Sequence, residues 1–228
     1  MSNVSSLRLV VLDCDGTMVD SLQSLVDCLD VAFTAHGLTP PQRSLVRNGI
    51  GLELFEAVER LAPDLSKPDL ERLANTYRDV ALAKQDNGDW DDPLYPGARD
   101  AIQLMDRENW LLGIATGKSY RGVEKLLQRH DLKDYFITRQ TSDRAAGKPN
   151  PEMLFNAMRD TGVDKASTVM VGDTSFDMEM AVNAGVSAIG VSWGYHSNDD
   201  LNRAGADIII DHYSQLFGAV EKLLGPIR

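Results

Sequence analysis

The amino-acid sequence predicts an α/β protein, with a parallel sheet covered by helices on both faces and an all-helical unit inserted into it. Two observations favour this class. Short apolar runs alternate with segments of helical periodicity, which is the pattern of parallel strands joined by helices. After the first of these runs, residues 21–91 show helical periodicity alone.

The first strand is expected at residues 9–12, an apolar run that leads straight into Asp13. Such a run is typical of a strand buried on both faces of a sheet. The same reasoning predicts later strands at residues 111–115, 168–171, 187–191 and 207–210. Because ligands bind beyond the carboxyl ends of parallel strands, the polar residues after these runs are expected to meet in one place.

The inserted helical unit is predicted to span residues 21–91, between core segments 1–20 and 92–228. Apolar residues recur at helical spacing in three segments of the insertion, residues 22–33, 52–61 and 70–80. Glycine, proline and acidic residues at 87–93 mark the expected linker back into the core.

Composition excludes several classes of protein. The 228 residues include 23 Lys and Arg against 34 Asp and Glu, a net charge of −11, and no basic stripe for nucleic acid is present. No window reaches the ~18 uninterrupted apolar residues of a membrane span, and no signal-peptide pattern begins the chain. With only two cysteines, we expect a cytoplasmic protein without a disulfide scaffold, nucleic-acid partner or membrane partner.

Asp13 and Asp15, in Asp13-Cys14-Asp15-Gly16-Thr17, place two carboxylates where the first strand stops. One carboxylate can attack a phosphoryl group and form an aspartyl-phosphate, while the other handles a proton. The segment alone leaves open a simpler role, in which both only cap a turn.

Asp173 and Asp177 add two carboxylates at the end of another predicted strand. Four clustered carboxylates repel one another unless a cation shares the site, and Mg²⁺ is the expected ion because it bridges carboxylates to phosphate. Asp177 is expected either to reach metal-bound water or simply to favour the first turn of a helix.

Thr116, Gly117 and Lys148 are the candidate phosphate-binding residues. Thr116 and Gly117 follow a predicted strand and offer a hydroxyl and a backbone amide, although a threonine there often only caps a helix. Lys148 lies between a glycine and a proline that restrict its backbone. Beside four acidic groups, a fixed ammonium is expected to hold phosphate and moderate their repulsion.

Together these motifs resemble the haloacid dehalogenase superfamily, in the phosphatase branch with a helical cap after the first strand, and the resemblance covers almost the whole chain. It implies a Rossmann-like three-layer core, with Asp13 as nucleophile and Asp15 as general acid/base. Mg²⁺ is then expected on the Asp13 carboxylate, the Asp15 backbone carbonyl and Asp173, with Asp177 acting through water. The resemblance also places the phosphoryl group on Thr116, Lys148 and backbone amides near Asp15, Gly16 and Gly117.

Substrate selection is expected to come from the cap, which closes over the site. Residues 47–52 are predicted to be the loop that faces the core, because two glycines free the backbone there. Arg47 is a candidate partner for a substrate carboxylate, with a solvated arginine as the alternative. The cap resembles that of phosphoglycolate phosphatases, so phosphoglycolate is the favoured single substrate.

Two other functions stay open at this stage. A sugar phosphomutase of the β-phosphoglucomutase type has a similar core and cap, and releases an isomer rather than phosphate. A non-enzymatic phospho-Asp switch also combines Asp, Thr and Lys at a sheet edge, but the insertion and Asp15 argue against it. For the enzymes the partner is a small phosphate ester, and a monomer or homodimer is expected.

Three further segments have structural expectations. Cys14 is expected to pack in the core, because strand alternation turns it away from the two aspartates. Asp20-Ser21 is expected to cap the first helix of the insertion. Residues 193–196 follow a core strand and are expected either to line the entrance or to pack at its rim.

Overall fold

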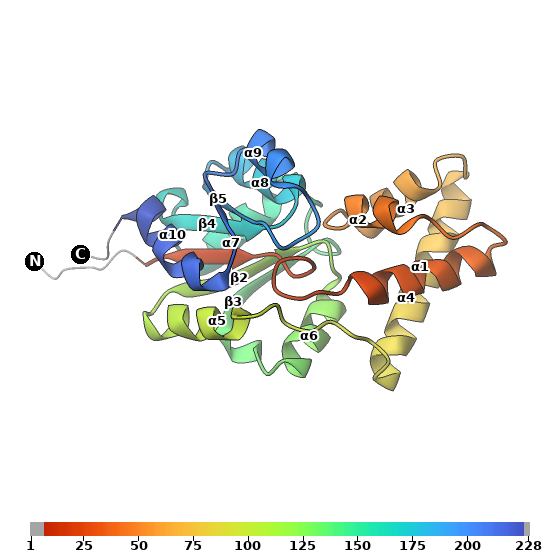
Figure 1. The fold of residues 1–228 in the computed structure, drawn as a ribbon, viewed down its shortest axis with the longest axis horizontal. Coiled ribbons are helices and arrows are strands. Elements are labelled where there is room, and N and C mark those ends of the chain that lie inside the picture. Colours follow the sequence, from red (N-terminus) through yellow and green to blue (C-terminus); the bar gives the residue numbers. More distant parts are fainter. Residues whose placement is uncertain (1–6, 226–228) are drawn as a thin grey trace, which may run out of the picture.

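Six parallel strands form the central sheet of the computed structural model, which describes residues 7–225 (Figure 1). They lie in the order β3-β2-β1-β4-β5-β6. Their bounds are β1 (Leu9–Leu12), β2 (Leu111–Thr116), β3 (Phe136–Thr141), β4 (Thr168–Gly172), β5 (Ser187–Val191) and β6 (Ile208–Ile210). The predicted fold class is confirmed.

The strand β1 lies at the centre of the sheet, between β2 and β4. Its last residue, Leu12, pairs with Ile114 on one side and Val171 on the other, so three strands end at the same edge. All four residues of β1 are fully buried, as expected for a strand covered on both faces. This register places the polar residues that follow the strands close together.

Helices cover both faces of the sheet. Alternate side chains of β1 enter opposite apolar clusters, with Val10 and Leu12 in one and Leu9 and Val11 in the other. Cys14 belongs to the first cluster, so its expected packing role is confirmed. The first face is covered by α5 (Ala98–Arg107), α6 (Tyr120–Arg129) and α10 (Leu216–Leu224), and the second by α7 (Glu152–Thr161), α8 (Ser175–Ala184) and α9 (Asn198–Ala204).

Between β1 and α5 the chain forms the cap, which comprises α1 (Leu22–Ala35), α2 (Arg43–Gly49), α3 (Leu54–Leu61) and α4 (Lys67–Asn87). The cap lies to the right of the sheet in Figure 1 and packs around its own apolar cluster. Its longest helix, α4, begins where the Ser66 side chain accepts the N–H of Asp69 and ends at Gly88, whose φ is +80°. The cap therefore has a core separate from that of the sheet.

Two elements differ from the sequence-based prediction. The strand β3 was not predicted, because Arg139 and Gln140 interrupt its apolar pattern and Ile137 is 61% exposed. It lies at the edge of the sheet, where a strand needs no continuous apolar run. The expected loop at residues 47–52 is partly wrong, because α2 continues through Arg47 to Gly49.

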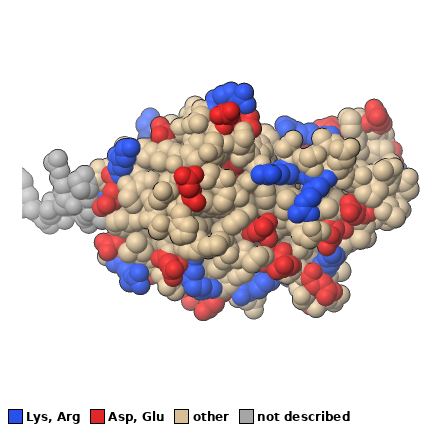
Figure 2. Space-filling view, viewed as in Figure 1, with Lys and Arg blue, Asp and Glu red and all other residues tan. Residues whose placement is uncertain are grey.

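Three further features concern the surface charge, the cysteines and the apolar character of the helices. On the face shown in Figure 2, acidic and basic side chains are interspersed over core and cap. Cys14 and Cys28 are both buried and free. Within residues 7–225, no helix combines the length and apolar character needed to cross a membrane.

Candidate active site

Asp13 lies directly after β1, at the edge where the strands end. Its N–H donates to the carbonyl of Val171 at 3.0 Å, which extends the strand pairing by one residue. The chain then turns, with the Met18 N–H donating to the Cys14 carbonyl at 2.8 Å and Gly16 at φ +83°. Because this φ favours glycine, Gly16 makes the tight turn possible and leaves the Asp13 side chain buried at the strand end.

Three buried carboxylates converge at this edge, and we call them the acidic group. Asp13, Asp173 and Asp177 each offer an oxygen, and these oxygens lie within 4.8 Å of one another. Asp173 also accepts from Thr17 Oγ1 at 2.8 Å and from the Tyr195 N–H at 2.9 Å. Like charges at such distances repel, so the group has the composition of a site for a hard divalent cation.

Two glycines leave room for Asp173. A Cβ on Gly16 would lie 2.1 Å from its Oδ2, and a Cβ on Gly194 would lie 2.1 Å from its Cβ. The Gly16 N–H donates to the Val19 carbonyl at 2.9 Å, so in this geometry Gly16 provides space for Asp173 while its amide is held within the turn. Residues 193–196 thus reach the acidic group through their backbone.

Asp177 lies in the first turn of α8, one of its two expected roles, while a role through metal-bound water stays a prediction. Its Oδ2 accepts from the N–H and the hydroxyl of Thr174, at 3.0 and 2.7 Å, in a capping box that begins α8. Its Oδ1 lies 2.6 Å from Lys148 Nζ. One carboxylate therefore both fixes the start of α8 and belongs to the group of three converging carboxylates.

Lys148 joins the nucleophile candidate to Asp177. Its side chain has no exposed surface, and Nζ lies 2.9 Å from Asp13 Oδ1. Burial alone would lower the pKa of the ammonium, but the charges of Asp13 and Asp177 outweigh it and raise that pKa. The lysine is therefore held in its charged form.

The pKa values of the neighbouring carboxyls move upward. Burial raises the pKa of Asp13 to about 6, with Lys148 opposing the rise and Asp177 adding to it. Burial and the charges of Asp177 and Asp13 raise the pKa of Asp173 well above its usual range. Both carboxylates are thus placed where an additional positive charge would stabilise their ionised forms.

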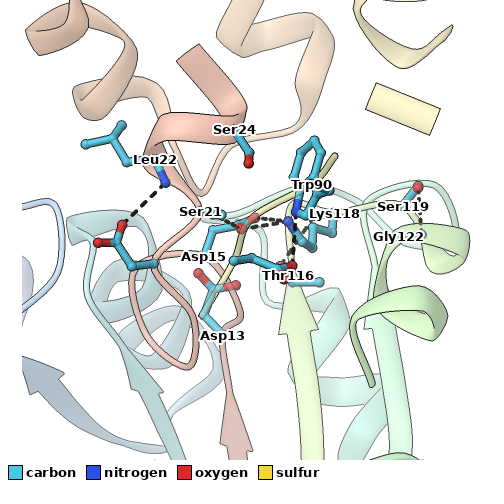
Figure 3. A network of polar contacts seen from close by, with 12 residues as sticks. Asp13, Asp15, Ser21, Leu22, Ser24, Trp90, Thr116, Lys118, Ser119 and Gly122 are labelled. Atoms are coloured by element: carbon cyan, nitrogen blue, oxygen red, sulfur yellow. Dashed lines mark hydrogen bonds and ion pairs between the residues drawn. The ribbon is translucent and has the colours of Figure 1, made fainter. Parts of the chain in front are cut away.

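Asp15 has a different environment, shown in Figure 3. Lys118 Nζ lies 2.6 and 2.7 Å from its two oxygens, and the Ser21 hydroxyl donates to the same carboxylate. Asp15 raises the pKa of Lys118 despite the opposing effect of burial. The prediction that Asp20-Ser21 caps α1 holds only in part. The Ser21 side chain makes no capping hydrogen bond, but Asp20 Oδ1 accepts the N–H of Leu22, the first residue of α1, at 3.4 Å.

Lys118 was missed by the sequence analysis. Its partner Asp15 lies 103 positions away in the chain, so no local pattern joins them. The available signal was its position two residues after Thr116, directly beyond the end of β2. Any charged residue there is placed at the same sheet edge as Asp15.

The predicted phosphate-binding residues Thr116 and Gly117 lie at the end of β2, where Gly117 meets the cap. Thr116 is buried, and its hydroxyl accepts the Lys118 N–H at 3.3 Å. A Cβ on Gly117 would lie only 2.4 Å from the carbonyl oxygen of Leu52. We call residues 50–53 the contact loop, because they approach the core at two places. Besides the contact of Leu52 with Gly117, Glu53 lies close to Gly147, where an added Cβ would be 3.1 Å from the Glu53 Cβ.

The cap and the sheet edge enclose a cavity of about 470 Å³. Its lining includes Asp13, Asp15, Thr116 and Gly117 on the side of the sheet. Arg47 is not brought into this cavity; it lines a different hollow between cap and core, and its guanidinium donates to the Gly194 carbonyl at 2.8 Å. It therefore ties the cap to the loop after β5.

Comparison with curated proteins finds phosphatases. The chain is 34% identical to a "Probable phosphatase IndB" of Dickeya dadantii, over 95% of this chain and 94% of the relative. It is 28% identical to a phosphoglycolate phosphatase of Vibrio vulnificus, over 94% and 96%. It is also 27% identical to an N-acetylmuramic acid 6-phosphate phosphatase of Pseudomonas putida, over 96% and 98%.

Solved structures share the fold over nearly the whole chain. A haloacid dehalogenase-like family hydrolase from Streptococcus pneumoniae superposes with a TM-score of 0.82 at 22% identity, covering 95% of this chain and 99% of the other. A predicted phosphoglycolate phosphatase from Haemophilus somnus gives 0.83 at 21%, covering 95% and 99%. Residues 10–191 match the family of haloacid dehalogenase-like hydrolases, as the resemblance predicted. The chain belongs to this hydrolase family.

Proposed function

We propose that this hydrolase is a Mg²⁺-dependent phosphatase that cleaves a small phosphomonoester through an aspartyl-phosphate on Asp13. The proposal rests on the buried cluster in which Asp13 lies beside Lys148, Asp173 and Asp177. A nucleophilic carboxylate, a fixed ammonium and an acidic group for a divalent cation are the parts that phosphoryl transfer needs.

The proposed metal ligands are the carboxylates of Asp13 and Asp173 and the backbone carbonyl of Asp15, with Asp177 acting through water. The residues fit this ion, because the oxygens of three buried carboxylates lie within 4.8 Å of one another, and a cation among them would stabilise their ionised forms. When bound, Mg²⁺ neutralises charge on the phosphoryl oxygens and lets the anionic nucleophile approach.

In the first step, an oxygen of Asp13 attacks phosphorus and the bond to the leaving alcohol breaks. Lys148, Thr116 and the amide of Gly117 are the proposed donors to the phosphoryl oxygens. Asp15, in its protonated form, gives its proton to the leaving oxygen. The alcohol leaves, and the phosphoryl group stays on Asp13.

In the second step, water attacks the phosphorus of the aspartyl-phosphate. Asp15, now a carboxylate, takes the proton from that water, and the bond from phosphorus to the Asp13 oxygen breaks. Lys118 and Ser21 hold Asp15 from two sides, which limits its rotamers between the two steps. Free phosphate and the original carboxylate are produced.

The substrate class is a small phosphorylated metabolite, and phosphoglycolate is the first compound to test. Support comes from the sequence resemblance and from the phosphoglycolate phosphatases among the relatives. Another relative is named for N-acetylmuramic acid 6-phosphate, so compounds with a larger leaving group belong in the same panel.

The experiment is phosphate release from this panel, with Mg²⁺ and with EDTA, by the wild type and by Asp13→Asn. We expect metal-dependent release that Asp13→Asn reduces to background with the fold intact by circular dichroism, because the amide is not a nucleophile. The matched control is Asp64→Asn at an exposed cap position. Retained activity in Asp13→Asn would refute the nucleophile, and an isomerised product without phosphate release would identify a mutase.

A further inference from the structure

The cavity between the sheet edge and the cap has two unlike ends. Asp13 and Thr116 line the end at the sheet, while leucine, isoleucine, valine and tryptophan side chains provide most of the cap wall. Its volume of about 470 Å³ lies in the range of roughly 300–1,000 Å³ typical of small-molecule sites. The phosphate end and the leaving-group end therefore have different chemistry.

Ile50, Leu52 and Leu82 are the apolar residues that point most directly to a ligand. They line the cavity, yet they belong to none of the apolar clusters found within residues 7–225. Ile50 and Leu52 are only 9% and 4% exposed. These three side chains thus border the cavity without belonging to a packed apolar cluster, and Leu82, which is half-buried, leaves more of its surface open to the cavity than the other two.

The charges around the cavity do not provide for a second anionic group. Among the described lining residues each cation already faces a carboxylate within 4.0 Å, namely Lys118 with Asp15, Arg78 with Glu53 and Arg121 with Asp86. Lys118 also lies 5.4 Å from the centre of the Trp90 ring. Asp143 adds a further negative charge to the lining, which disfavours a carboxylate on the leaving group.

We propose, on the basis of the phosphatase activity above, that the preferred substrate has a neutral leaving alcohol with an apolar body at least as large as an aromatic ring. The phosphate lies at Asp13 and Lys148, and the apolar body lies against Ile50, Leu52 and Leu82. A two-carbon anionic leaving group, as in phosphoglycolate, leaves this apolar wall unfilled and meets no unpaired cation among the described lining residues.

The test is a series of ethyl, butyl and hexyl phosphates, with phosphoglycolate alongside. The three alkyl esters have nearly the same leaving-group chemistry, so differences in kcat/KM report contact between the chain and the cavity. We expect kcat/KM to rise about fourfold per added methylene, the contribution of burying one such group. Hexyl phosphate should exceed phosphoglycolate by about tenfold or more.

A variant pair links the preference to the wall. Leu82→Arg places a cation among the apolar lining, and should flatten the alkyl series while raising phosphoglycolate relative to hexyl phosphate. Leu45→Arg makes the same change on α2 at a site that is 53% exposed and outside the cavity. The control should keep the slope of the wild type.

The outcomes separate this inference from the phosphatase proposal. Release from ethyl phosphate with no dependence on chain length, or a preference for phosphoglycolate, overturns the apolar leaving group and leaves the phosphatase standing. No metal-dependent release from any ester overturns both. If kcat/KM rises with chain length equally in the wild type, Leu82→Arg and Leu45→Arg, the apolar body does not lie against this wall.

Discussion

The sheet edge and the cap surface use charge in opposite ways. At the sheet edge, the side chains of Lys148 and Asp13 are 0% and 1% exposed in their ion pair. In the cap, the paired side chains of Arg60 and Glu56 are 50% and 41% exposed. Exposed pairs contribute little to stability, and buried charges persist only when they are paired. The comparison shows that the edge charges depend on one another because water does not reach them, while each cap charge is also stabilised by solvent.

The largest effect should come from Lys148→Met, which leaves Asp13 and Asp177 buried without their shared counter-charge. We expect a loss of about 3–5 kcal/mol in the free energy of unfolding in EDTA, and phosphate release reduced at least ~100-fold. Urea unfolding and steady-state kinetics measure both, with the exposed Lys165→Met as control. Wild-type stability in Lys148→Met would break the contrast between edge and cap.

Gly117→Ala tests the contact between the two regions. The new Cβ would lie 2.4 Å from the Leu52 carbonyl, a backbone atom that cannot rotate away, so the contact loop must shift. We expect kcat/KM to fall by about 10- to 100-fold, the usual effect of displacing a positioned group by about an ångström. Gly218→Ala is the control, since a Cβ added at this helical glycine would meet no neighbouring side chain or loop within 4 Å. Unchanged kinetics in Gly117→Ala would mean that this contact is not needed in turnover.

Cation binding at the sheet edge should weaken as the pH falls through about 6, where Asp13 takes up a proton. The pKa of Asp13 is higher in the folded state than its ordinary 3.8. In EDTA, the protonated carboxyl therefore makes its full contribution to the free energy of unfolding below about pH 4, and that contribution is lost as the pH rises through 6. Mg²⁺ should therefore raise the Tm by a few degrees near neutral pH and by less near pH 5. Calorimetry measures this rise in Tm, and Asp173→Asn should remove the rise. Equal rises in Tm at both pH values would contradict the prediction.

The smallest effect should come from the cap surface. Arg72 pairs with Asp69, but these side chains are 64% and 41% exposed. Arg72→Ala should leave the urea midpoint and kcat/KM unchanged within error, because solvent already stabilises both charges. A clear loss of stability would show that cap charges do more than keep the surface soluble.

The central strands and the acidic group were predictable because each has a local sequence pattern. The apolar runs of β1 and β4 end at Asp13 and Asp173, and parallel topology brings strand ends to one edge. β3 was not predictable in the same way, since an edge strand with polar side chains lacks the apolar run of a buried one. Periodicity alone thus finds the centre of a sheet better than its edge.

The contacts that the sequence did not predict join residues that are distant in the chain. The ion pair of Lys118 with Asp15 and the bond from Arg47 to the Gly194 carbonyl join segments 103 and 147 positions apart. Sequence spacing carries no sign of such pairs. The apolar wall of the cavity was hidden for another reason, because leucines that face a ligand and leucines that face a core have the same helical periodicity.

The position of β1 in the sheet also determines how much of the chain must be synthesised before this strand can pair on both sides. Leu9 pairs with Leu111 and with Thr168, so the strand that carries Asp13 emerges first and waits for partners made much later. The cap helices, complete at Asn87, are synthesised before either partner strand. Asp177 is the last of the three converging carboxylates to be made. A nascent chain therefore contains the whole cap before its sheet edge can bring the three carboxylates together.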